Sequence, residues 1–118
     1  TRATITPFFD EFGIDLCLSG HDHYYSRSYI VKNNKVTDDV ISGDTYKNPK
    51  GTLYISANSS SGSNYNGIDE ENVGPECDFW YQTRIPCYSV LSVSGDKLTV
   101  STFETEENSM IDTVSIIK

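Results

Sequence analysis

The chain has two histidines, His21 and His23, and a single residue separates them. In an extended segment, side chains at positions i and i+2 project toward the same side. Imidazole is the commonest metal ligand of proteins near neutral pH. Gly20, just before the pair, permits a backbone bend that a Cβ would hinder. The pair is therefore a candidate metal site, although the histidines of an isolated H-x-H pair more often lie at the surface or form hydrogen bonds without binding metal.

Two neighbours could support such a site from outside the ligand shell. Asp22 could accept a hydrogen bond from a ligating imidazole ring, and Arg27 supplies a planar cation able to bind an anion. Two imidazoles cannot complete a zinc or two-metal site, because each ion needs about four ligands. The remaining ligands must then be carboxylates, amides, water or another part of the protein.

The elements around the histidines have the order of an α/β fold. A short helix is expected to begin at Thr6-Pro7, to carry an apolar face made by Phe8, Phe9 and Phe12, and to end at Gly13. A buried strand over 14–18 then leads directly into 19–23, at the edge where open α/β sheets bind ligands. Further strands are expected over 24–31 and 51–57. No strand precedes the helix, which indicates that part of the fold is missing.

The second half of the chain is β-rich. A hairpin is expected over 88–103, around the turn at 94–97, followed by a strand over 110–117 with Val114 and Ile116 on one face. The polar stretch 37–50 is expected at the surface. We divide the chain into a metal-ligand half (1–62), a loop (63–86) and a terminal hairpin with its strand (87–118).

Charge and length exclude several classes of protein. The 118 residues carry a formal net charge of -8, which disfavours a nucleic-acid platform. No run approaches the roughly 20 apolar residues of a membrane span. Residues 1–59 hold seven acidic and six basic residues, and residues 60–118 hold ten and three. The first half is therefore the better host for an anionic ligand.

The three cysteines leave alternatives open. Cys17 lies in the apolar run before Gly20 and is expected in the core. Cys77 and Cys87 flank a loop, and either a disulfide or two free thiols suits their spacing. No C-x-x-C pair is present, so zinc binding by cysteine is not expected.

Two further clusters are weaker candidates. The run 59–62 (Ser-Ser-Ser-Gly) has no histidine left to act as a base if His21 and His23 bind metal, which disfavours a serine nucleophile. The acidic group 69–71 lacks the alternating ligand spacing of a calcium-binding EF-hand loop. We interpret the first as a tight turn and the second as a solvated loop.

The run Ser19-Gly20-His21-Asp22-His23, followed by Tyr25 and Arg27, resembles the last signature block of calcineurin-like metallophosphoesterases, particularly their purple acid phosphatase-like branch. The similarity extends over residues 2–31 and 51–62 and, loosely, over the final hairpin. It implies the C-terminal part of a four-layer α/β/β/α sandwich, of class α/β and β-rich in this fragment.

The resemblance implies a binuclear metal centre in which His21 and His23 each ligate one of two ions, with Fe, Zn or Mn as candidates. The ions would polarise a phosphoryl oxygen of a phosphate ester and generate an attacking hydroxide. Arg27 is expected outside the ligand shell, in a salt bridge to a carboxylate. Tyr25 is expected to pack beneath the site.

The family's other signature blocks (D-x-H, G-D-x-x-D or its tyrosine variant, and G-N-H-E or G-N-H-D) are absent from this sequence. The chain, which opens without a methionine or leader pattern, is thus expected to be a fragment, inactive alone, whose partner is the missing N-terminal part. Exposed sheet edges would favour a homodimer of the fragment. The resemblance and a Cys77–Cys87 bridge would favour export.

The rival hypothesis is a non-catalytic β-rich binding or surface module with structural histidines.

Overall fold

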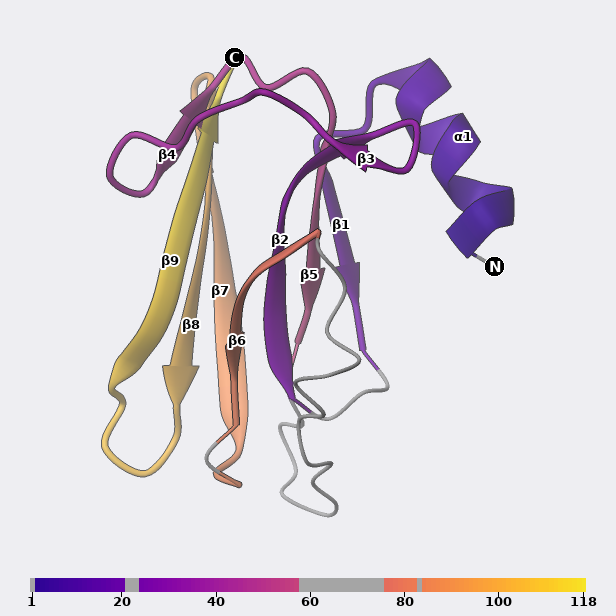
Figure 1. The fold of residues 1–118 in the computed structure, drawn as a ribbon. Coiled ribbons are helices and arrows are strands. Elements are labelled where there is room, and N and C mark those ends of the chain that lie inside the picture. Colours follow the sequence, from indigo (N-terminus) through magenta and orange to yellow (C-terminus); the bar gives the residue numbers. More distant parts are fainter. Residues whose placement is uncertain (1, 21–23, 58–75, 83) are drawn as a thin grey trace.

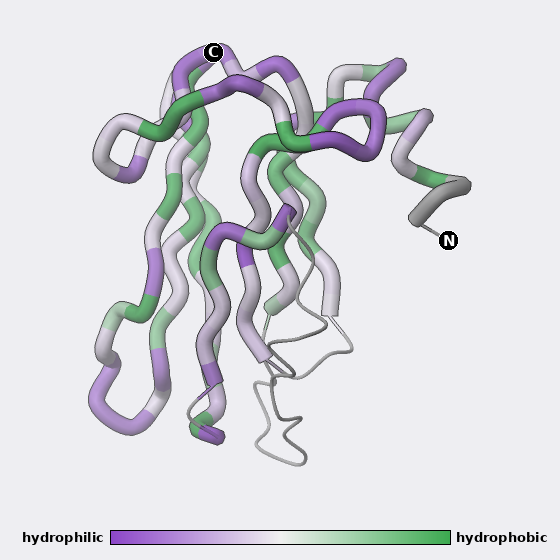
Figure 2. Tube along the Cα trace, viewed as in Figure 1, coloured by the Kyte–Doolittle hydropathy of each residue, from purple (hydrophilic) through white to green (hydrophobic). Residues whose placement is uncertain are grey.

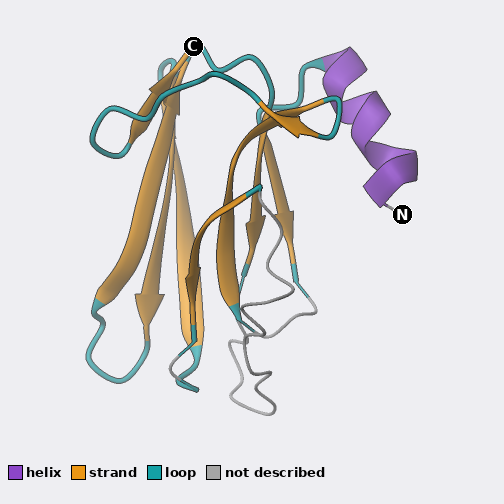
Figure 3. Ribbon diagram, in the orientation of Figure 1, coloured by secondary structure: helices purple, strands orange, loops and turns teal. Residues whose placement is uncertain are grey.

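The computed structural model describes residues 2–20, 24–57, 76–82 and 84–118. Helix α1 (Arg2–Phe12) lies beside the first of two β-sheets, and the second sheet faces the first from the other side (Figures 1 and 3). The described residues therefore supply one helical layer and two sheet layers, as expected for part of a four-layer sandwich.

The first sheet has the order β1-β5-β2-β3, and β6 also pairs with β2. The pairing of β1 with β5 is parallel, whereas β2 runs antiparallel to β5, β3 and β6. Its strands are β1 (Leu16–Ser19), β2 (Tyr25–Lys32), β3 (Lys35–Val36), β5 (Thr52–Ser56) and β6 (Cys77–Tyr81).

The second sheet has the order β4-β9-β8-β7. A two-residue turn at Gly95-Asp96 joins β7 to β8, and Gly95 has the positive φ of 59° that such turns require. The pairing of β4 with β9 is parallel. Its strands are β4 (Thr45–Lys47), β7 (Cys87–Ser94), β8 (Lys97–Glu104) and β9 (Met110–Ile117).

The core lies between the two sheets. The inward-facing residues recur at every second position, as Leu53 and Ile55 do in β5 and Val114 and Ile116 do in β9. A bulge in β2 between Arg27 and Ile30 shifts this alternation by one residue and returns Ile30 to the inner face. Hydrophilic residues gather in the connecting loops (Figure 2). The buried cluster consists of Tyr25, Ile30, Tyr46, Leu53, Ile55, Val100, Val114 and Ile116.

Helix α1 differs from its expected form. It begins at Arg2, so Pro7 lies inside it and not at its first position, although Gly13 (φ 65°) ends it as expected. The expected apolar face does not pack as a unit. Phe9 contacts the ring of Tyr54 with centroids 6.3 Å apart, whereas Phe8 and Phe12 are 55% and 72% exposed.

Two strands occur where loops were expected. Strand β4 lies in the polar stretch 37–50 and buries Tyr46, and β6 lies within the expected loop 63–86. Both are short and are held by partners far away in the sequence, β9 for β4 and β2 for β6. The hairpin of β7 and β8 and the final strand β9, with Val114 and Ile116 buried, confirm the sequence prediction.

Candidate functional site

Several strand ends meet at one edge of the first sheet. Ser19 ends β1, Ser56 ends β5, and the two are paired in register. Ser26, near the start of the antiparallel β2, pairs with Ser56 from the other side. The amide of Ala57 donates a hydrogen bond to the carbonyl of Ser19 at 2.8 Å. The carboxyl ends of β1 and β5 and the start of β2 therefore form one edge, which is where α/β folds place ligands.

The connection from β1 to β2 contains His21, Asp22 and His23, and these three residues lie outside the described part of the chain. Their neighbours are placed: Ser19 and Tyr25 lie on either side of β5, on the two strands that pair with it.

The described residues at this edge supply no set of metal ligands of their own. Ser56 Oγ, at the carboxyl end of β5, is buried and finds no hydrogen-bond partner among the described residues. Within the described ranges, no group of three or more His, Cys, Asp or Glu residues is arranged to hold a metal ion. Two imidazoles alone form an incomplete donor set for a pair of ions.

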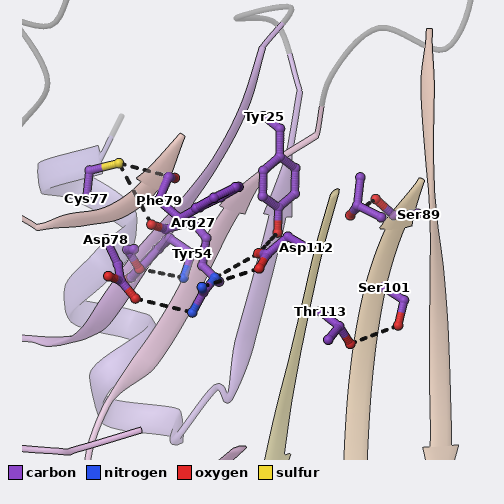
Figure 4. Close-up of polar contacts among 12 residues, drawn as sticks. Tyr25, Arg27, Tyr54, Cys77, Asp78, Phe79, Ser89, Ser101, Asp112 and Thr113 are labelled. Carbon is purple, nitrogen blue, oxygen red and sulfur yellow. Dashed lines mark hydrogen bonds and ion pairs between the residues drawn. The ribbon is translucent and has the colours of Figure 1, made fainter. Parts of the chain in front are cut away.

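Next to this edge, between the two sheets, a buried polar network joins them (Figure 4). The carboxylate of Asp112 in β9 accepts hydrogen bonds from Tyr25 OH at 2.6 Å and from Arg27 Nε at 2.8 Å, both on Oδ2. Arg27 Nη2 donates to Oδ1 of the same carboxylate at 3.3 Å. The bidentate contact fixes the guanidinium plane as well as its position.

Arg27 has a second carboxylate partner and an aromatic one. Its Nη1 atom lies 3.3 Å from Asp78 Oδ2 in β6 and forms an ion pair with it. The geometry of this contact is not that of a hydrogen bond. The guanidinium carbon lies 6.0 Å from the ring centroid of Phe79, within cation–π range. The salt bridge expected for Arg27 is therefore present, and Tyr25 is fully buried beneath the edge, as expected.

Burial, the hydrogen bond to Asp112 and the charge of Asp112 all raise the pKa of Tyr25 far above its usual range. A phenol in this environment stays protonated, because its ionised form would be desolvated beside a carboxylate. Tyr25 therefore serves as a hydrogen-bond donor to Asp112.

Sequence reasoning did not identify Asp112 as part of this region. Its position in the sequence could have indicated this role. Asp112, Val114 and Ile116 occupy every second position of β9, so the carboxylate lies on the face that carries core residues. A charge on such a face requires a buried partner of opposite sign. The partner itself, Arg27, is 85 positions away and has no local signal.

All three cysteines are free thiols, which decides between the two alternatives for Cys77 and Cys87. Cys77 Sγ donates to the carbonyls of Phe79 and Arg27 at 3.5 and 3.8 Å. Burial raises the pKa of Cys77 and of Cys17. Both thiols are therefore mostly protonated near neutral pH and poorly nucleophilic.

A comparison with protein-family models finds no match for the chain. Among solved structures, the purple acid phosphatase PPD1 from yellow lupin (Lupinus luteus) seeds matches over 96% of this chain, with a TM-score of 0.70 and 16% sequence identity. The chain shares its fold with part of a purple acid phosphatase. The resemblance found in the sequence is thus confirmed at the level of the fold, and so is the β-rich fold class.

The match covers 19% of the lupin phosphatase chain, so this chain spans about a fifth of that length. None of the described helices is long and apolar enough to cross a membrane.

Proposed function

We propose that this chain is part of a metal-dependent phosphoric ester hydrolase and supplies His21 and His23, one ligand to each of two metal ions. The observation that carries the proposal is the coincidence of two independent features. The fold is similar to part of a purple acid phosphatase, and the G-H-D-H segment of the sequence connects β1 and β2 where they flank the carboxyl end of β5.

Bound metal would supply Lewis-acid activation of a phosphoryl oxygen and a hydroxide nucleophile at neutral pH. The contribution of this chain is to hold the histidines at the sheet edge, with Asp22 and Arg27 outside the ligand shell. Arg27 is committed to Asp112 and Asp78 and is largely buried, so it supports the strand and does not contact substrate phosphate.

The other ligands and most of the substrate pocket would come from an N-terminal part of the same protein, which on this proposal is the principal partner of the chain. Fe, Zn or Mn would suit a site that combines imidazole with oxygen ligands. The chain alone is then inactive, because it lacks the bridging ligands that hold two ions together.

Phosphatase assays test the proposal. The full-length protein should hydrolyse p-nitrophenyl phosphate when supplied with Fe, Zn or Mn, and His21→Ala or His23→Ala should lower kcat by at least about 100-fold. Ser94→Ala, at the exposed end of β7, is a control that should leave kcat unchanged. Full activity in both histidine variants would overturn their ligand roles, and a full-length protein that hydrolyses no phosphate ester would favour a non-catalytic β-rich module with structural histidines.

A further inference from the structure

The start of β2 is bound at two points to a strand of the opposite sheet. Tyr25 and Arg27 are the second and fourth residues after His23, and both side chains end on the carboxylate of Asp112. We call these three residues the Asp112 clamp. Figure 4 shows the Tyr25 hydroxyl and the Arg27 guanidinium converging on Asp112.

The three side chains of the clamp are buried, and the hydrogen bonds between them are short. Tyr25 is 0% exposed, and the side chains of Arg27 and Asp112 are 10% and 9% exposed. Its shortest bonds, 2.6 and 2.8 Å, are in the range of charge-assisted hydrogen bonds. In a buried environment such bonds are not weakened by competing water.

Two bonds from alternate residues of one strand restrict that strand more than one bond does. Sliding β2 by one residue would turn Tyr25 and Arg27 to the other face of the sheet and leave the Asp112 charge buried without a partner. The bulge just beyond Arg27 separates this segment from the rest of β2. The position of the β2 start is therefore fixed by Asp112 as well as by its neighbouring strands.

We propose that Asp112 is a positioning residue for the metal site: by holding Tyr25 and Arg27 it fixes the point at which the chain leaves His23 and enters β2. Asp112 touches neither metal nor substrate in this role. The inference rests on the proposed function, because it assigns Asp112 a task only if His23 is a ligand.

Metal affinity and melting temperature together distinguish a positioning role of the clamp from a purely structural one. Replacing a buried ion pair by apolar residues of similar size often preserves stability. If the clamp only joins the sheets, the double variant Arg27→Met with Asp112→Leu should keep both its melting temperature and its metal affinity. If the clamp positions the ligand strand, metal affinity should fall even where the melting temperature is kept.

The test is metal affinity in the full-length protein, measured by chelator competition with Zn²⁺ and Mn²⁺ as probes, together with the melting temperature of each variant. Tyr25→Phe removes one hydrogen bond at nearly constant volume and should raise the Kd for one ion by about tenfold. The double variant should raise it by about 10- to 100-fold. The matched control Ile116→Val, in the core of β9, should lower the melting temperature without changing the Kd.

Asp112→Asn keeps an acceptor oxygen for Tyr25 or Arg27 and should therefore retain more affinity than Asp112→Ala. Wild-type Kd values in Tyr25→Phe and in the double variant would overturn the positioning role alone, provided that His21→Ala and His23→Ala lose metal. A wild-type protein that binds neither probe would overturn the proposed function and this inference together.

Discussion

Arg27 shows how one side chain links three strands. It extends from β2 to Asp112 in β9 and to Asp78 in β6, with the ring of Phe79 nearby. A buried charge of this kind is stable only while it is paired, because desolvation costs several kcal/mol per ion. Its partners come from both sheets, so the contact that neutralises the charge also joins the layers.

Removing one member of this pair should be costly. Arg27→Ala leaves Asp112 buried and unpaired and should lower the free energy of unfolding by about 3–5 kcal/mol. Combining Arg27→Met with Asp112→Leu should recover most of this loss, since neither charge then remains at the Asp112 end of the network. Urea unfolding of the three proteins measures both values. Equal stability of Arg27→Ala and wild type would contradict this description of the network.

At the scale of elements, helix α1 is the most weakly held. Its contacts with the first sheet and the β2–β3 turn, among the described residues, include the ring contact of Phe9 with Tyr54, a hydrogen bond from Thr6 to Asn34 at 3.3 Å, and a bond from the Asn33 amide to Asp10 at 2.9 Å. Helices shorter than about 12–15 residues are marginal in water without tertiary packing. The exposure of Phe8 and Phe12 shows how little of the apolar stripe is buried here.

Amide hydrogen exchange should therefore rank the elements. In the isolated chain, amides of α1 should exchange much faster than those of β5 and β9, which bury Leu53, Ile55, Val114 and Ile116. In the full-length protein, α1 should become protected, since the proposal supplies further layers to cover its apolar face. Equal protection of α1 and β5 in the isolated chain would contradict this ranking.

The elements also show what the sequence could and could not predict. Strands β2, β5, β7, β8 and β9 were predictable because each is long or strongly apolar, with turn residues at its ends. The sequence analysis places β6 in a loop although Phe79-Trp80-Tyr81 is a β-favouring run, because the acidic and glycine-rich residues before it favour a loop over 63–86. Strand β4 has three residues, and its pairing with β9 leaves no local pattern.

For the candidate site, the histidine pair could be proposed from residue types and spacing, whereas the expectation of a salt bridge for Arg27 came with the family resemblance. Asp112 could not be matched to Arg27, since a pairing across 85 positions depends on how two sheets face each other. The ligand roles of His21 and His23 remain proposals, because both residues lie outside the described part of the chain.

At the scale of the whole molecule, the sandwich is open along one side. β1 ends the first sheet and β7 ends the second. The side chains of Leu18, Leu91 and Val93 face the space between the sheets, yet they are 47%, 50% and 73% exposed. A groove of about 350 Å³ between Asp15 and the β7–β8 turn lies at one end of this side.

Unpaired strand edges beside exposed apolar side chains favour association. We expect the isolated chain to self-associate, as a dimer or larger species, and Leu91→Lys with Val93→Lys to shift it toward monomer. Size-exclusion chromatography with light scattering measures the mass directly. A wild-type chain that is monomeric at all concentrations would show that these edges do not drive association.

The central claim is that His21 and His23 each bind one ion of a metal pair. The most direct test is the metal content of purified full-length protein, measured by elemental analysis. We expect about two ions per chain for the wild type and about one or none for His21→Ala and His23→Ala. An unchanged metal content in both variants would contradict it.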